Sequence, residues 1–276
     1  MKHIPFRKYY PFLKGSWLTV LAYRVHIYMW MLGDVVSAVL MILLWTAIYR
    51  AQPQTGTVMI HGFTLGGMIQ YVLVAKIATG MIGYTETFWN LSEDIRSGSV
   101  AMTLMKPISY RLKNVSTTIG GFFATFAMMT LPLMAVLYAV LAYMHLPLPS
   151  WSAFLMFLFT SFLGLIIMDT LDFLFGLSAI FTGALFGLGQ IKTIVFQFLS
   201  GALIPLSFFP DWLNRVISFL PYKTTVATPI SILLGQIDAS GYLAVIALQV
   251  FWIVCLNAAA KLLFDRLIKH VVVAGG

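Results

Sequence analysis

The stretch Trp151–Ile180, WSAFLMFLFTSFLGLIIMDTLDFLFGLSAI, decides the fold class of this chain. Asp169 and Asp172 are its only charged residues, and both lie in its second half. A helix needs about 20 apolar residues to cross the hydrocarbon core of a bilayer. The stretch is longer than that, so we predict that it forms a membrane-spanning helix.

Five further stretches have the same character: residues 25–49, 63–84, 115–143, 185–206 and 242–263. A membrane barrel would need short strands of alternating polarity, whereas these runs are long and continuously apolar. The composition agrees, because 60% of the 276 residues are hydrophobic and only 9% are charged, against roughly 25% charged residues in soluble domains. We predict an all-α integral membrane protein in which residues 1–276 form one transmembrane domain with six spans.

The basic residues predict the orientation of these spans. If both termini are cytoplasmic, twelve of the seventeen Lys and Arg residues lie on the cytoplasmic side, Arg50, Arg215 and Lys223 lie outside, and Lys76 and Lys192 lie within spans. Cytoplasmic loops of membrane proteins carry such an excess. Basic flanks that lie against the lipid bilayer explain the net charge of +8. We therefore expect no nucleic-acid partner.

Two linking segments differ from ordinary loops. Residues 1–24, above all 4–17, mix aromatic and basic side chains, which suits a helix lying along the inner leaflet and broken by Pro11. The simpler alternative is a basic flank that orients the first span. Residues 207–241 have helix-like apolar spacing interrupted by prolines, which predicts short re-entrant helices on the extracytoplasmic side, covered by protein or lining a cavity. The residues that we assign to this re-entrant region are Gly201, Pro205, Pro210, Trp212 and Pro221.

Specific motifs occur in loop 85–114 and after the fifth span. The loop contains IRSGSV at 95–100 and LMKPIS at 104–109, and the later region contains SGALIPL at 200–206 and FFPDWL at 208–213. Together with Tyr23-Arg24 ahead of the first span, these motifs resemble the ABC-2 type permeases of bacterial ATP-binding-cassette exporters, in particular the six-span subfamily associated with drug and antibiotic export. The resemblance covers essentially the whole chain.

This resemblance implies a permease subunit that forms a dimer with a second permease, identical or homologous, and is driven by two separate ATPase subunits. It also implies that loop 85–114 holds a coupling helix seated in a groove of the ATPase. Gly98 permits a sharp turn there, Pro107 ends the segment, and Phe88, Trp89 and Leu91 are expected to be apolar anchors. The predicted docking residues are Glu86, Trp89, Glu93, Asp94, Arg96, Gly98, Lys106 and Pro107.

ATP binding is expected on the partner and not in this chain. The sequence has no G-x-x-x-x-G-K-[ST] motif to hold phosphates. Its glycine pairs at 66–67 and 120–121 lie in apolar spans, where close helix packing explains them better. The five histidines are scattered and Cys255 is the only cysteine. We therefore expect no catalytic set, metal or cofactor here, ATP and Mg²⁺ on the partner ATPase, and a multi-pass location in the bacterial inner membrane.

Four charged residues are predicted to form a polar patch inside the spans: Asp34, Lys76, Asp169 and Asp172, with Lys192 nearby. A charge facing lipid at mid-span costs roughly 2.5–3.5 kcal/mol, so these groups should face the helix bundle. Asp169 and Asp172 are three residues apart and share one helix face, and Lys76 is expected to pair with one of them. The patch either fastens spans two and four, the interpretation that we favour, or lines an inward cavity and contacts substrate or protons.

Two other functions are compatible with the sequence. The chain could be a secondary transporter driven by an ion gradient, with the intramembrane carboxylates as proton carriers, although no internal repeat of the kind common in such transporters is evident. It could also be a membrane scaffold or sensor that recruits an ATPase without transporting anything. Dependence of transport on ATP or on a proton gradient separates the first alternative from the permease, and substrate-stimulated hydrolysis separates the second.

Overall fold

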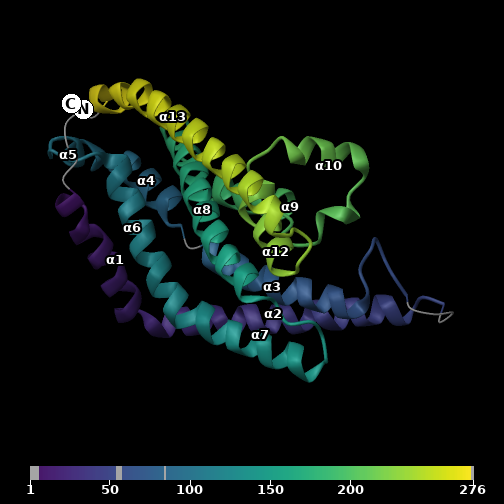
Figure 1. Ribbon diagram of the computed structural model, residues 1–276. Helices are drawn as coiled ribbons and strands as arrows, with labels where there is room; N and C mark the ends of the chain where they lie inside the picture. The colour runs from purple at the N-terminus through teal and green to yellow at the C-terminus, as the bar shows by residue number, and fades with distance from the viewer. Residues whose placement is uncertain (1–5, 54–57, 84, 275–276) are drawn as a thin grey trace.

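The computed structural model describes residues 6–53, 58–83 and 85–274, with side chains up to Leu267. The regular secondary structure of this part of the chain is helical, with no strand beyond one isolated bridge between Ile60 and Phe63, which confirms the all-α class. The helices are α1 Tyr10–Ala22, α2 Arg24–Arg50, α3 Leu65–Ile82, α4 Thr87–Arg96, α5 Val100–Leu104, α6 Tyr110–Thr125, α7 Leu131–Tyr143, α8 Trp151–Gly176, α9 Leu185–Leu199, α10 Asp211–Ser218, α11 Tyr222–Thr225, α12 Ala227–Leu233 and α13 Tyr242–Ala274 (Figure 1).

Five helical runs among the described residues are long and apolar enough to cross a bilayer. They are Arg24–Arg50, a run beginning with α3 at Leu65, Tyr110–Tyr143, Trp151–Ile180 and Ala239–Leu267. The third run joins α6 to α7 through a π-helical turn, and the fourth extends α8 by a 3₁₀ turn at Leu177–Ile180. A sixth crossing results only if α10 and the helical stretch Tyr222–Leu233, which meet at 75°, count as one span.

The fifth predicted span, residues 185–206, is wrong in length. Its helix, α9, has 15 residues and ends at Leu199. Gly201 follows with φ +78°, a left-handed conformation in which helices commonly end, and Pro205 cannot donate a backbone hydrogen bond. At 1.5 Å per residue α9 reaches about 22 Å, less than the roughly 30 Å of a bilayer core.

Pro11 begins α1 and does not break it, contrary to the sequence prediction. It occupies the first turn of the helix, where its missing N–H leaves no hydrogen bond unmade. α1 then packs along α6. A Cβ atom at Gly120 of α6 would lie only 2.1 Å from the carbonyl oxygen of Leu13, so the two backbones touch there. This contact confirms that close packing explains Gly120.

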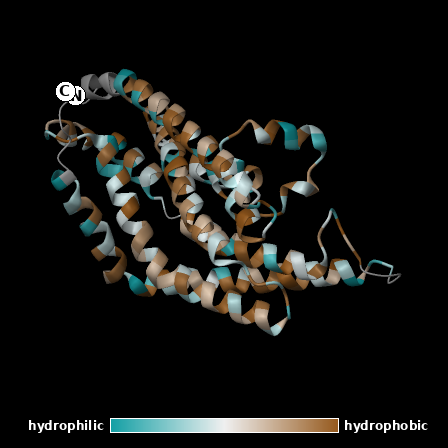
Figure 2. Cartoon of the chain, in the orientation of Figure 1, coloured by the Kyte–Doolittle hydropathy of each residue, from teal (hydrophilic) through white to brown (hydrophobic). Residues whose placement is uncertain are grey.

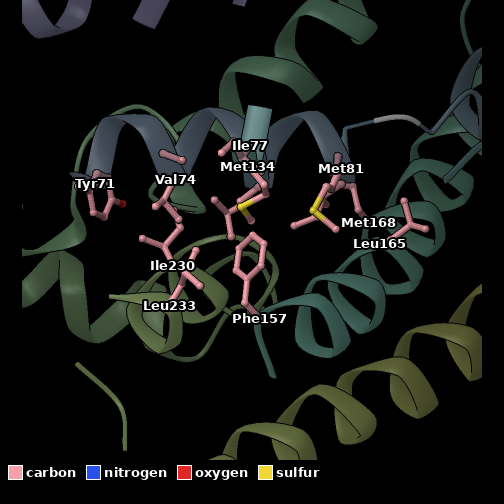
Figure 3. Close-up of a cluster of buried hydrophobic side chains, with 14 of the residues drawn as sticks. Tyr71, Val74, Ile77, Met81, Met134, Phe157, Leu165, Met168, Ile230 and Leu233 are labelled. Carbon is pink, nitrogen blue, oxygen red and sulfur yellow. The ribbon is translucent and has the colours of Figure 1, made fainter. Parts of the chain in front are cut away.

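The core of the molecule lies where α3, α8 and α12 meet. Side chains from these helices converge there, joined by Met134 of α7 (Figure 3). The buried share of the most apolar window is 56% in the run that begins with α3 but only 11% in α2 and in the run containing α13. In Figure 2 the ribbons of these two outer helices are coloured brown, for hydrophobic residues, along much of their length. Such exposed apolar surface is what a bilayer or a second membrane subunit covers. The labelled core residues are Tyr71, Val74, Ile77, Met81, Met134, Phe157, Leu165, Met168, Ile230 and Leu233.

The segment after α9 is held against three of the long helices. The Tyr71 hydroxyl of α3 donates a hydrogen bond to the Gly201 carbonyl. A Cβ atom at Gly164 of α8 would lie 2.8 Å from the Thr225 carbonyl oxygen, so α11 approaches α8 closely. The buried Gln249 side chain of α13 donates to the carbonyls of Thr160, at 2.9 Å, and Thr224, at 2.7 Å. Protein therefore covers this irregular backbone, as a membrane setting requires.

The residues that we assigned to the re-entrant region do not form one site. Pro205 and Pro221 are buried, whereas Pro210 and Trp212 are exposed, Trp212 by 63%. Pro210 and Pro221 directly precede α10 and α11. They act as helix starters, because proline is already fixed in a conformation that suits a first turn.

Candidate docking surface and the charged cluster behind it

Loop 85–114 folds largely into helix. α4 ends at Arg96, a turn follows, α5 runs from Val100 to Leu104, and α6 begins at Tyr110. Gly98 in the turn has φ +71°, and a Cβ atom there would meet nothing within 4 Å. The turn therefore needs glycine for its backbone conformation and not for space, which confirms the predicted sharp turn.

The inner face of α4 packs against its own chain. Phe88 and Leu91 are fully buried and Ile95 nearly so, and α4 contacts α8 and the Leu177–Ile180 turn. A Cβ atom at Gly176 would lie 3.1 Å from the Leu91 side chain. Spacing of three to four residues places these apolar groups on one helix face. Phe88 and Leu91 are thus not available as anchors for a partner, contrary to the prediction, and only Trp89 stays exposed, by 45%.

The outer face of α4 is polar. Glu93 and Arg96 are exposed and form an ion pair at 2.9 Å, a surface pair of small energetic value. Asp94 instead turns inward: it accepts hydrogen bonds from the Tyr110 hydroxyl at 2.6 Å and the Ser99 hydroxyl at 2.7 Å. Its carboxylate thereby ties α4 to α5 and to the start of α6. The other predicted docking residues Glu86, Lys106 and Pro107 are exposed.

A polar cleft of about 250 Å³ lies between α1, α4 and α6. Its walls include Ser16 of α1, Asn90 and Glu93 of α4, and Lys113 and Thr117 of α6. The backbone N–H of Ser109 donates to the Tyr9 hydroxyl at 2.9 Å, so the residue before α1 lies against the α5–α6 connection. The N-terminal segment and loop 85–114 therefore form one continuous surface.

Two ion pairs lie directly behind this surface, and Asp169 of α8 belongs to the first. It is 1% exposed, and its carboxylate pairs with the Arg111 guanidinium at the start of α6. It also accepts hydrogen bonds from the hydroxyls of Thr87 and, at 2.6 Å, Thr118. Arg111 was assigned to loop 85–114, but it belongs to α6, and its long side chain reaches back into the bundle.

Asp172, one turn further along α8, belongs to the second pair. Its carboxylate is fully buried and lies 2.9 Å from the Lys192 ammonium of α9, and the Thr85 hydroxyl donates to it. The Lys192 ammonium also lies 5.1 Å from the centre of the Phe88 ring, an arrangement in which a cation is attracted to the ring face. Both α8 carboxylates thus have a cation and at least one hydroxyl.

Lys76 pairs with neither of these carboxylates, contrary to the prediction. Its ammonium lies 3.8 Å from Asp34 of α2, and both side chains are about one-third exposed. Lys76 lies on the side of α3 that faces α2, whereas Val74, Ile77 and Met81 are buried in the core. The predicted patch is therefore two separate features: the α2–α3 pair, and the α8 cluster with Arg111 and Lys192. Two buried carboxylates call for two cations, a signal in the sequence that could have prompted a search for partners besides Lys76 but does not by itself identify Arg111.

Comparison with known proteins identifies one family. The family described as "ABC-2 family transporter protein" matches residues 35–275. No curated protein and no solved structure matches the chain. The matched range contains α4, α5, the charged cluster and the bent pair of helices near α10.

Proposed function

This chain belongs to the ABC-2 family of transporter proteins, and we propose that it is the permease subunit of an exporter driven by a separate ATPase. Family membership and the long apolar helices make it a multi-pass membrane transport protein. The proposal adds that α4 and α5 dock the ATPase, that two ATPase subunits serve a pair of permeases, and that the complex lies in the bacterial inner membrane.

The observation that carries the proposal is the division of α4 into two faces. Its buried face packs on α8 and its exposed face presents Glu93, Arg96 and Trp89. A helix outside the apolar core needs a polar surface only where it meets water or a soluble partner. Because the opposite face contacts a span directly, force applied to α4 by such a partner reaches the membrane helices.

The arrangement of the chain ends supports a cytoplasmic position for this unit. α5, the start of α1 and the C-terminal end of α13 lie at the same end of the molecule (Figure 1). Arg7 and Lys8 precede α1, Arg96 and Lys106 flank α5, and Arg266 lies in α13. An excess of basic residues favours the cytoplasmic side. In this orientation α1 runs from the inner leaflet, and α10 to α12 enter the membrane from the outer side as re-entrant helices.

The exposed apolar surfaces of α2 and α13 supply the area for lipid and for a second permease. Exposed side chains include Trp30 and Leu40 of α2 and Phe251 and Val254 of α13. A substrate path would then form between two permease subunits and would open alternately to the two sides. A proton-driven transporter has less support, because each α8 carboxylate is already paired with a cation.

Charge reversal on the outer face of α4 tests the docking role. In the single variant Glu93→Arg, like charges replace the Glu93–Arg96 pair and the surface pattern inverts. We expect the variant to insert and accumulate normally but to lose most of the ATPase that co-purifies with the wild-type chain. The altered face of α4 would no longer match the charges of the ATPase surface, and like charges repel across an interface. Arg215→Glu on α10, also exposed, is the matched control on the opposite side.

The turn at Gly98 gives a second variant pair for the same assay. Valine is strained at positive φ, whereas asparagine tolerates it. Gly98→Val should therefore lower ATPase co-purification and ATP hydrolysis in liposomes, and Gly98→Asn should retain both. If Glu93→Arg and Gly98→Val both keep full complex formation, loop 85–114 is not the docking element, and the role moves to residues 7–17.

A further inference from the structure

We propose that Asp169 and Asp172 of α8 are positioning residues that hold the first turn of α4 through Thr87 and Thr85. The docking helix then moves as one body with α8. This inference rests on the proposed function, because it assigns the route by which a docked ATPase acts on the spans.

Three neighbouring residues at the start of α4 are held by the cluster. The Thr85 hydroxyl donates to Asp172 and the Thr87 hydroxyl donates to Asp169. Phe88 lies beneath the Lys192 ammonium. All three side chains are buried, with exposed fractions of 8%, 3% and 0%. Hydrogen bonds to an ionised acceptor are stronger and more directional than neutral ones, so they fix the position and rotation of this turn.

The threonine hydroxyls are not needed to balance charge. Arg111 already pairs with Asp169, and Lys192 already pairs with Asp172. Each ion pair is already electrically neutral, so the hydroxyls contribute directional hydrogen bonds and not charge balance. Further along α4, Leu91 and Ile95 make apolar contacts, which are not directional and tolerate sliding better than hydrogen bonds.

The same two carboxylates connect the start of α4 to four longer helices. Through Asp169 the contact continues to Arg111 of α6, whose guanidinium also donates to Thr170 of α8 at 2.6 Å and Asn257 of α13 at 3.2 Å. Through Asp172 it continues to Lys192 of α9. A displacement of α4 thus meets directional contacts to α6, α8, α9 and α13 within one cluster.

The double variant Thr85→Val/Thr87→Val removes both hydroxyls and keeps side-chain volume, ion pairs and the outer face of α4. Thr85→Ser/Thr87→Ser is the conservative rescue. Thr79→Val is the control, because the Thr79 hydroxyl of α3 donates within its own helix, to the Ala75 carbonyl at 2.7 Å. Each is made in a Cys255→Ala chain with spin labels at Leu44 of α2 and Leu155 of α8, both exposed, and purified with the ATPase that accompanies the wild-type chain.

The measurement is the distance between the two labels, by pulsed electron paramagnetic resonance, with and without ATP and vanadate. We expect the double valine variant to bind the ATPase and hydrolyse ATP, while the fraction of molecules whose distance shifts falls by about tenfold, the order of effect of a hydrogen bond to a charged group. The serine variant and Thr79→Val should shift as the wild type does.

Each other outcome counts against a specific claim. If the double valine variant shifts like the wild type, the hydroxyls transmit nothing and the inference is wrong. If it loses the ATPase, Thr87→Val alone is measured by the same criterion, and a loss of binding there makes the contact purely structural and also overturns the inference. If the wild type binds the ATPase but the distance between the labels does not change with ATP and vanadate, α4 has no motion to transmit. If no ATPase accompanies the wild-type chain, the proposed function itself fails.

Discussion

Among the described residues, two places in the apolar part of the molecule hold ion pairs, and these places differ in what surrounds them. On α8, Asp169 and Asp172 are buried and each has a close cation and at least one hydroxyl. Between α2 and α3, Asp34 and Lys76 are 3.8 Å apart and one-third exposed. The first pairs are almost completely enclosed by residues of the chain itself. The second is partly exposed between α2 and α3, and in the proposed complex lipid or another subunit completes its surroundings.

The largest expected effect comes from removing the cation of the most connected pair. Arg111→Met leaves Asp169 buried without its positive partner, and breaking a buried pair in this way costs about 3–5 kcal/mol. We expect a sharp fall in folded yield and in the midpoint of thermal unfolding in detergent. Adding Asp169→Asn to the variant should restore part of the loss. Equal stability of the single variant and the wild type would show that the buried pair does not fasten α6 to α8.

A smaller effect is expected at Asp172, because α9 is short and Lys192 has fewer hydrogen-bond partners than Arg111, which also donates to Thr170 and Asn257. Lys192→Met should destabilise the chain by about 2–3 kcal/mol, toward or below the lower end for a broken buried pair, while Lys192→Arg keeps the charge. The measurement is thermal unfolding of the three proteins side by side. If Lys192→Met destabilises the chain more than Arg111→Met does, the Asp172–Lys192 pair is the more important of the two. In that case α9 contributes more to stability than its length indicates.

The smallest effect belongs to the pair on α2 and α3. A partly exposed ion pair contributes about 0–1 kcal/mol, so Lys76→Met in the isolated chain should barely change its thermal unfolding. The same substitution should matter more in the assembled complex if a second subunit covers this surface. A loss in the isolated chain as large as that of Arg111→Met would remove the contrast between the two regions.

The sequence predicts most of the long helices, because an apolar run of sufficient length is nearly a sufficient condition for a span. Trp151–Ile180 agrees in full with a helical run of the structure. The end of α9 was not predicted, because the backbone at Gly201 and Pro205 ends the helix although the residues around them are apolar. The sharp turn at Gly98 was predicted correctly, since glycine in a short polar motif has a direct conformational meaning.

The partners of the intramembrane charges were not predictable from depth alone. Lys76 was assigned to α8 by depth, but its angular position on α3 turns it toward α2. Angular position relative to neighbours depends on how the helices cross, which sequence spacing within one helix does not specify. Arg111 was missed for a related reason: it precedes the apolar run, and only the folded bundle shows that its side chain points back inside.

The backbone contact between Leu13 and Gly120 sets a condition on the order in which this protein is made. α1 precedes α2, α3, α4 and α5 along the chain, and the α6 surface that receives it is synthesised only after all of them. A chain emerges and begins to fold from its N-terminus. Throughout that interval α1 has no α6 to bind, and α2 is the long helix already made that it contacts. Synthesis of the segment around Gly120 is thus the step that lets the N-terminal helix dock against its main partner.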